Sequence, residues 1–344
     1  YQVSTEQYHK LLLENVTKDY RQVTNVEVDS INMEAKSIAQ DLKLADRIET
    51  FGNAEAYITI KDHKEDYKNK TKCRLINPAK SQIGEISKQI LQNVNQELRE
   101  STNLKQWQST KSVLDWFKGI RYHSRKQFLQ LDVVEFYPSI TEKLLNEAIG
   151  FAQEHLDITE QQIKIIKQAR KSLLYCRPTT SAPDVLAWTK KNSLFDVTMG
   201  APDGAEVCEL VGLLILSKLK AKFKMLDFGL YRDDGLAVHS RMKPHQLDDI
   251  RKDLHALFAT FDLRITVVTG QTTVDFLDVT LDLAKENFRP YRKENDSPLY
   301  VNTGSNHPPN VLKQIPIGIN KRLSNISRTR ADFDNAKPDY QEAL

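Results

Sequence analysis

The spacing of apolar positions changes several times along the chain, which predicts a fold that mixes helices and strands. Residues 1–50 place apolar and polar side chains at helical spacing, so we expect a helical start. Residues 56–60 and 73–77 are short β-rich runs on either side of a basic segment, residues 61–72. Two such runs around a polar segment are typical of a hairpin with a long loop.

The middle of the chain predicts one sheet with helices between its strands. The run FLQLDVV at 128–134 has the composition of a buried strand and stops before Pro138, which cannot continue a ladder. Further predicted elements are a helix that starts at Ser139 in a capping box with Glu142, a helix over 159–175, an irregular stretch over 176–197, a buried helix over 205–223, a hairpin that turns at Asp233, Asp234 and Gly235, a helix over 245–261, and strands over 263–268 and 274–283. This order fits a split βαββαβ sheet of the α+β class.

Composition narrows the class of protein. The chain has 344 residues and 40% hydrophobic content, which is enough for several packed sub-domains. It contains no run of eighteen apolar residues and no signal-peptide layout, so we expect no membrane partner and an intracellular protein, nuclear in a eukaryote. The three cysteines lie far apart without CxxC spacing, which speaks against a zinc site and fits a reducing compartment.

The positive charges lie in blocks, although the net charge is only +3. Residues 61–80 carry seven Lys or Arg against three acids, residues 116–131 four against none, and residues 311–330 five against none. One block of this kind is usually a solvated face. Three blocks around an acidic centre indicate that a polyanion passes a metal site.

Two aspartates are the candidate metal ligands. Asp132 lies near the end of the strand run at 128–134, and Asp233 lies in the predicted turn. Carboxylates at such places suit Mg²⁺, and two Mg²⁺ ions support phosphoryl transfer from a nucleotide. The ordinary alternative is that Asp-Asp-Gly is a turn signal and that an aspartate after an apolar strand has no special role.

Three motifs resemble those of reverse transcriptases. DVVEFYPSI at 132–140 is similar to motif A, TMGAPDG at 198–204 to motif B, and YRDD at 231–234 to the Y-x-D-D of motif C. The segments KDHK, CRLINPAKSQIGEISK, FLDV and SNHPPNVLKQIPIGINKRLSNIS resemble parts of Penelope-like element reverse transcriptases. Some features depart from the family: Thr269 stands where many members carry a lysine that protonates pyrophosphate, and Met199 precedes Gly200 where retroviral relatives commonly have Gln. These residues also contain neither a GIY-YIG nuclease segment nor an RNase H constellation of carboxylates.

The resemblance implies a right-hand polymerase fold with fingers, palm and thumb. It assigns residues 1–55 to a helical N-terminal extension, 56–127 to the fingers, 128–283 to a palm with a helical insertion at 140–197, and 284–344 to the primer grip and thumb. It also implies an RNA-directed DNA polymerase of a retrotransposon, which extends a primer 3′ end with two Mg²⁺ ions that Mn²⁺ can replace. Its partners would be an RNA template, a DNA primer or target DNA, and dNTPs.

By the same resemblance, each motif supplies residues to the site. Asp132 and Asp233 would hold both metal ions, with the backbone carbonyl of Val133 as a further ligand and Asp234 as a supporting catalytic carboxylate. The nucleotide-binding residues would be Lys61, Lys64, Arg74, Tyr137, Gly200, Ala201 and Pro202. Contacts to primer and template would come from Tyr231, Phe276, Leu277, Lys313, Lys321 and Arg322.

Structural roles remain open for several of these residues. Arg74 could be a strand-edge charge, and residues 200–202 could be a plain loop before a helix. Phe276 and Leu277 could be core residues.

Tyr137 bears on the alternative functions. In the family this ring lies under the ribose, where it leaves no room for a 2′-hydroxyl, so Tyr137 argues against an RNA-dependent RNA polymerase. It could instead pack in the core, although Tyr137 and its neighbour Phe136 would face opposite sides of an extended chain. A catalytically silent nucleic-acid-binding protein of the same fold is the other alternative, which the presence of all motif carboxylates disfavours.

Overall fold

The computed structural model describes most of the chain, which forms two compact units. The described residues are 3–41, 43, 54–60, 71–78, 81–171, 173–178, 182, 184–293, 300–302 and 304–342. The first unit contains Tyr1–Leu104, Val134–Lys218 and Phe261–Leu263, and the second contains Lys105–Val133, Leu219–Thr260 and Arg264–Leu344. The chain passes between the units several times, so neither unit is one continuous stretch of sequence.

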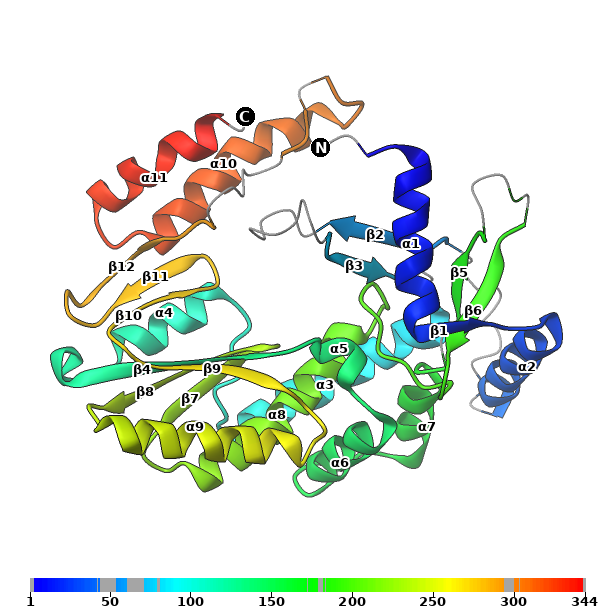
Figure 1. The fold of residues 1–344 in the computed structure, drawn as a ribbon, viewed down its shortest axis with the longest axis horizontal. Coiled ribbons are helices and arrows are strands. Elements are labelled where there is room, and N and C mark those ends of the chain that lie inside the picture. Colours follow the sequence, from blue (N-terminus) through cyan, green and yellow to red (C-terminus); the bar gives the residue numbers. More distant parts are fainter. Residues whose placement is uncertain are drawn as a thin grey trace. The chain divides into compact units, whose positions relative to one another are not determined.

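A four-stranded antiparallel sheet is the centre of the second unit. Its strands lie in the order β7-β8-β4-β9, and their bounds are Lys126–Val133 for β4, Asp227–Tyr231 for β7, Asp234–Ser240 for β8 and Ile265–Gln271 for β9. Helix α9, Pro244–Ala259, connects β8 to β9 and packs against β9 (Figure 1). The predicted split βαββαβ order and the α+β class are therefore confirmed.

Strand β4 shows how the sequence positions an acidic residue at the end of this sheet. Leu129, Leu131 and Val133 are buried, whereas Gln130 is half-buried and Asp132 is exposed. This alternation is the period of a strand with one face in the core. The buried side chains anchor β4, and Asp132 projects from its other face near the strand end.

A second antiparallel sheet follows in the same unit. It contains β10 Thr273–Phe276, β11 Val279–Asp282 and β12 Asn287–Pro290, in that order. The prediction of a single strand over 274–283 is wrong, because the chain reverses at Leu277 and Asp278 between β10 and β11.

Helices cover this second sheet and share one core with it. They are α4 Thr110–Lys118, α10 Pro309–Ile326 and α11 Arg330–Glu342, with a 3-10 turn at His123–Arg125. Helices α10 and α11 pack against each other and against β12 (Figure 1). Buried residues from every part, including Phe117, Phe128, Phe276 and Leu323, form the core.

Most of the helices belong to the first unit. Their bounds are Thr5–Asp19 for α1, Asn25–Asp41 for α2, Gln82–Thr102 for α3, Phe136–Ser139 for α5, Glu142–Gln153 for α6 and Glu160–Gln168 for α7, and α8, Gly204–Lys222, begins there. Helix α8 is the predicted buried helix, and its apolar residues from Val207 to Leu219 are buried.

Two predicted helix boundaries need correction. The helix predicted from Ser139 begins at Glu142, because the hydroxyl of Thr141, rather than that of Ser139, accepts the N–H of Leu144 at 3.2 Å. The next helix starts as expected, with Thr159 and Gln162 in a capping box, but it ends at Gln168 instead of residue 175.

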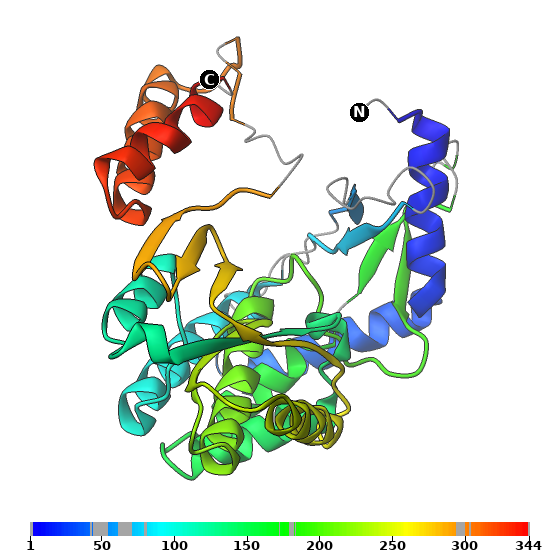
Figure 2. The ribbon, with the colours of Figure 1, turned by 60° about the vertical axis from the view of Figure 1, so that its left-hand side comes forward.

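The strands of the first unit form two small sheets. Strands β2 Tyr57–Ile60 and β3 Cys73–Ile76 are the predicted hairpin, whose loop at 61–70 lies outside the described residues. Helix α1 runs beside this hairpin (Figures 1 and 2), and the N–H of Ile58 donates to the hydroxyl of Tyr8 at 3.0 Å.

The other small sheet was not predicted. It has the order β1-β6-β5, formed by Tyr20–Gln22, Leu186–Lys190 and Leu174–Cys176. The expectations of an entirely helical start and of an irregular stretch over 176–197 are therefore wrong. No helix in the described ranges is long and apolar enough to span a membrane.

Candidate active site

Two neighbouring strands of the second unit bring acidic residues together. In the antiparallel pair of β4 and β8, Asp132 lies directly opposite Asp234. Directly opposed residues put their side chains on the same face, with Cβ atoms roughly 5 Å apart. The N–H of Val133 donates to the carbonyl of Asp233 at 3.0 Å, which fixes the hairpin turn beside the end of β4. The register therefore gathers three carboxylates at one end of the sheet.

The turn between β7 and β8 is tighter than predicted. It consists of Arg232 and Asp233, while Asp234 and Gly235 already belong to β8. Arg232 has φ 54°, in the left-handed region that residues other than glycine seldom adopt. A Cβ on Gly235 would lie 2.6 Å from Cδ1 of Leu131, so close packing against β4 accounts for this glycine.

The three carboxylates interact electrostatically. Burial of Asp234, together with the negative charges of Asp233 and Asp132, raises the pKa of Asp234 to about 7, while Lys293 acts in the opposite direction. Like charges this close disfavour the ionised form, and a cation bound among them would reverse that effect. The electrostatics of this strand end therefore favour a cation.

The available donor atoms suit Mg²⁺. Asp132, Asp233 and the backbone carbonyl of Val133 offer oxygen ligands only, which hard cations prefer. Among the residues that the structure describes, no group of three or more His, Cys, Asp or Glu side chains is placed so that it could hold a metal ion by itself. Mg²⁺ fits a partial site of this kind, because it commonly takes one or two carboxylates and completes its shell with water and substrate phosphates.

In the first unit, the loop at 198–204 is held against the end of β3. Gly200 has φ 98°, and a Cβ there would lie 2.6 Å from the carbonyl oxygen of Asn77. The N–H of Asn77 donates to the carbonyl of Met199 at 2.8 Å. Only glycine combines this conformation with so close a backbone approach. The loop is thereby joined to the strand that carries Arg74.

Arg74 lies on the exposed face of the β2–β3 hairpin. It is opposite Thr59 in the register, and both residues are exposed, whereas Ile58 is buried. The guanidinium therefore lies on the face that a ligand can reach. Lys61 and Lys64, the other predicted triphosphate ligands, lie outside the described residues.

Ala201 and Pro202 continue the loop as a compact turn into α8. The N–H of Ala201 donates to the carbonyl of Thr198, and the N–H of Gly204 donates to the carbonyl of Ala201, both at 3.3 Å. Ala201 and Pro202 are half-buried. The small side chains of this turn therefore lie directly before the first residue of α8.

A buried ion pair supports the same loop, and sequence reasoning missed it. The Arg170 guanidinium, 1% exposed, donates to the Asp203 carboxylate, which is 0% exposed. Arg170 follows α7, and the Asn77 side chain donates to the carbonyl of nearby Leu173 at 3.1 Å. Asp203 belongs to the quoted motif and could have prompted a search for a cation, but nothing around Arg170 marks it as the partner.

Tyr137 lies on the short helix α5, so the expectation of an extended chain here is wrong. Glu135, with φ 51°, turns the chain directly after β4, and α5 follows. Phe136 is 2% exposed, whereas Tyr137 is half-buried. A Cβ on Gly204 would lie 3.4 Å from Cε1 of the Tyr137 ring, so this ring lies beside the start of α8.

The three apolar candidates for primer contact occupy different positions. Phe276 is 2% exposed, and its ring lies 5.5 Å from that of Trp107, centroid to centroid, which is a core position. Leu277 is half-buried at the β10–β11 turn with φ 55°. Tyr231 is half-buried, and the Arg232 guanidinium lies 5.5 Å from its ring centroid. Leu277 and Tyr231 are therefore accessible to a ligand, whereas Phe276 belongs to the core against which both residues pack.

The basic candidates on α10 also differ from one another. Lys313 and Lys321 are exposed. Arg322 donates through Nε at 3.0 Å to Oδ2 of Asp278, which also lies 2.9 Å from Nη2 of Arg322. The Thr110 hydroxyl donates to the other oxygen of Asp278. Arg322 therefore anchors α10 to the β10–β11 turn, a role that the sequence did not suggest.

Comparison with known proteins gives matches at the level of structure. No protein-family model and no curated sequence matches the chain. The telomerase of Candida albicans, solved with a fragment of telomeric RNA, matches with TM-score 0.57 and 11% identity over 92% of this chain and 53% of the telomerase chain. Apo telomerase of Candida tropicalis gives TM-score 0.57 and 10% identity over 82% of this chain and 52% of that chain.

A weaker match is the RNA-dependent RNA polymerase of a human picobirnavirus, with TM-score 0.48 and 9% identity over 80% of this chain and 61% of that one. The telomerase matches, with TM-scores above 0.5, are the basis for the fold. The chain spans about half the length of those telomerase chains. The chain therefore has the right-hand polymerase fold that the sequence resemblance implied.

Proposed function

We propose that this chain is a template-directed nucleotidyltransferase, an RNA-directed DNA polymerase that extends a primer 3′ end. The observation that supports the proposal most is the β4–β8 register, which gathers Asp132, Asp233 and Asp234 at one end of the sheet. A sheet holds such groups in place before the substrate arrives, so little reorganisation is needed during reaction. The Penelope-like retroelement origin is a finer part of the proposal and depends on the sequence motifs.

In this proposal the palm residues hold the ions. Asp132, Asp233 and the carbonyl of Val133 would bind two Mg²⁺ ions, with Asp234 as the supporting carboxylate. When bound, such ions promote attack by the primer hydroxyl and neutralise the leaving pyrophosphate. The protein contributes the fixed positions of the ligands, on the rigid strand β4 and on the β7–β8 turn.

The β2–β3 hairpin and the loop at 198–204 would supply the residues that bind the incoming dNTP. Arg74, with Lys61 and Lys64, would contact the triphosphate, because the planar fork of arginine matches phosphate oxygens. Residues 200–202 would contact the newly formed base pair, since a loop with small side chains lets a ligand approach the backbone.

A primer-extension assay tests the proposal against its alternatives. One primer would be paired with matched RNA and DNA templates and supplied with dNTPs or NTPs, in Mg²⁺ or Mn²⁺. We expect the fastest extension on RNA with dNTPs. Faster extension with NTPs would favour an RNA-dependent RNA polymerase, and no extension by a folded protein under any condition would favour a silent nucleic-acid-binding protein.

Replacing Tyr137 with alanine tests the choice of sugar. If the half-buried ring limits space beneath the ribose, Tyr137→Ala should retain DNA synthesis and raise ribonucleotide incorporation at least about tenfold, roughly 1.4 kcal/mol of lost discrimination. The measurement is the ratio of kcat/KM for a dNTP and its matching NTP on one primed RNA template. Tyr137→Phe keeps the ring and should keep the ratio. An unchanged ratio in active Tyr137→Ala would remove this residue as the sugar gate.

Charge reversal on α10 tests nucleic-acid binding by the thumb. We expect Lys313→Glu/Lys321→Glu to weaken binding of a primer–template duplex and to reduce the slope of log K against log salt by about 0.9 for each phosphate that the protein no longer neutralises. Arg322 is left intact because it anchors α10 to Asp278. Lys224→Glu/Lys252→Glu makes the same charge change at exposed positions elsewhere in the second unit. Equal effects in both double variants would mean that α10 has no specific role.

A further inference from the structure

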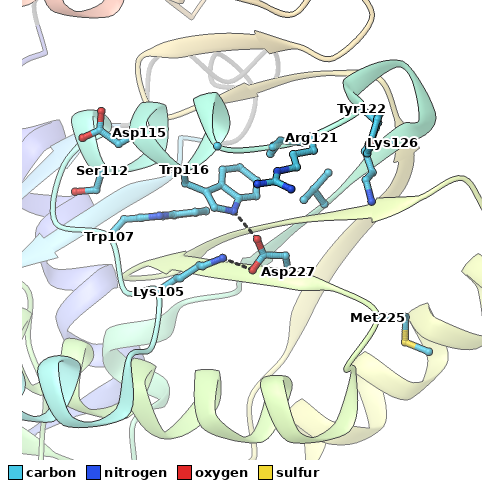
Figure 3. Close-up of a pocket in the computed structure, with 13 residues that line it drawn as sticks. Lys105, Trp107, Ser112, Asp115, Trp116, Arg121, Tyr122, Lys126, Met225 and Asp227 are labelled. Atoms are coloured by element: carbon cyan, nitrogen blue, oxygen red, sulfur yellow. Dashed lines mark hydrogen bonds and ion pairs between the residues drawn. The ribbon is translucent and has the colours of Figure 1, made fainter.

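A cavity of about 580 Å³ lies in the second unit (Figure 3). Its lining includes Lys126 at the start of β4 and Asp227 at the start of β7. Asp132 lies near the opposite end of β4, and Asp233 follows the opposite end of β7. Six residues of strand at about 3.3 Å each put the cavity roughly 20 Å from Asp132, so a ligand here is not the reacting nucleotide.

One wall of the cavity is aromatic and held in a fixed orientation. The rings of Trp107 and Trp116 lie 5.1 Å apart, centroid to centroid. The indole N–H of Trp116 donates to Asp227 at 2.9 Å, and Lys105 donates to the other oxygen of the same carboxylate at 2.5 Å; Figure 3 shows both side chains directed at Asp227. Tyr122, 72% exposed, adds a third ring at the rim.

The charge left around the cavity is positive. Its two acids have cationic partners, Lys105 for Asp227 and Lys111 for Asp115 at 2.8 Å. Arg121 and Lys126 also line the cavity. Both belong to the basic block at 116–131, which contains no acid and which the proposed function does not use.

The basic surface continues beside the cavity. Arg125 belongs to the same block and precedes Lys126. Its backbone carbonyl accepts the N–H of Arg241 at 3.1 Å, so the backbone of a further cationic residue lies beside Arg125. Both are exposed.

We propose that this cavity binds a nucleotide of a single-stranded nucleic acid, with the base against Trp116 and Tyr122 and the backbone phosphates near Arg121 and Lys126. Aromatic faces beside a cationic path are the means by which proteins hold single strands without reading sequence. The flat rings can stack on any base, and the cations favour a ligand with negatively charged phosphates. Binding here does not depend on polymerase activity, because a catalytically silent chain could carry the same site.

The test is photocrosslinking and affinity measurement with one probe. A fluorescein-labelled single-stranded RNA, roughly 15 nucleotides long with 4-thiouridine substitutions, falls within the span that single-strand-binding modules cover. It would be added to the full chain with an excess of unlabelled blunt duplex, which competes for duplex-binding surfaces. The test variant is Arg121→Glu/Tyr122→Asn, in which asparagine tolerates the φ of 57° at position 122. Trp116 is left unchanged, since its indole also packs against the core.

We expect crosslinks within residues 116–126 and about tenfold weaker binding by the double variant, while Lys252→Glu on α9 binds as the unaltered chain does. Unchanged affinity in the double variant, with crosslinks elsewhere, would overturn the proposal. If AMP competed as effectively as unlabelled single-stranded RNA, the ligand would be a free nucleotide. The proposal of a single strand would then be wrong. If no strand bound, the proposal would fail and the cavity would be left for a protein partner. If the unaltered chain gave these crosslinks but did not extend a primer, only the proposed polymerase function would be refuted.

Discussion

Replacing Asp132 or Asp233 with asparagine is expected to abolish primer extension and to leave the fold intact. Each substitution removes one negative ligand, and an amide oxygen cannot supply the lost charge to a divalent cation. We expect the rate of nucleotide addition to fall at least about a thousandfold, roughly 4 kcal/mol in activation free energy. The fold should survive, because Asp132 is exposed and Asp233 lies in a two-residue turn.

Single-turnover extension of a primed RNA template would measure this loss, with circular dichroism as the check on folding. Asp234→Asn should have a smaller effect, because we assign it a supporting role. Asp249→Asn makes the same chemical change at an exposed position on α9 and should leave the rate unchanged. Near-normal turnover in Asp132→Asn or Asp233→Asn would refute the assignment of metal ligands.

Asp203→Asn is expected to destabilise the protein by about 3 kcal/mol, because it leaves the buried Arg170 charge without a counter-charge. Removing one member of a buried pair costs far more than the pair contributes, since the remaining ion stays out of water. Asp203 belongs to the loop at 198–204, so the substitution should disturb this loop most. We therefore expect nucleotide binding to weaken as well.

Urea unfolding of Asp203→Asn and the unaltered chain would give this free energy difference. The matched control is Asp334→Asn, which removes a carboxylate from Arg330 in an exposed pair on α11 and should cost less than about 1 kcal/mol. If the two substitutions lowered the free energy of unfolding equally, the buried Arg170–Asp203 pair would be no more important for stability than an exposed pair.

The elements around the carboxylates were predictable because their signals are local. Strand β4 alternates buried and outward-facing residues up to Asp132, and the β7–β8 hairpin surrounds a short polar turn. Helix α8 is apolar over more than half of its circumference, and its apolar residues are buried as expected. Each of these signals lies within a few residues of the feature it predicts, and tertiary packing reinforces it.

Short strands and an unmarked turn escaped prediction for a physical reason. Strands β1 and β5 have three residues each, too few to show a period, and β1 pairs with β6 far along the chain. The reversal between β10 and β11 uses Leu277 in the left-handed region, where neither glycine nor proline marks a turn. The contacts of Asp278 with Thr110 and Arg322 stabilise this reversal, and they connect segments distant in sequence.

The same limit applies to the candidate site. Motif residues such as Asp132 and Gly200 could be proposed from the sequence, because their neighbours form patterns. Arg170 and the anchoring role of Arg322 were not, since each depends on a partner that only folding brings close.

Counting the Mn²⁺ ions that the carboxylates hold tests the assignment of two metal ions to Asp132 and Asp233. Electron paramagnetic resonance would follow Mn²⁺ titrated into the chain with a primer lacking a 3′-hydroxyl, its RNA template and the matching dNTP. We expect the unaltered chain to bind two more tightly held ions than Asp132→Asn/Asp233→Asn does under the same conditions. Identical Mn²⁺ binding by both proteins, with the nucleic acid bound in each, would contradict it.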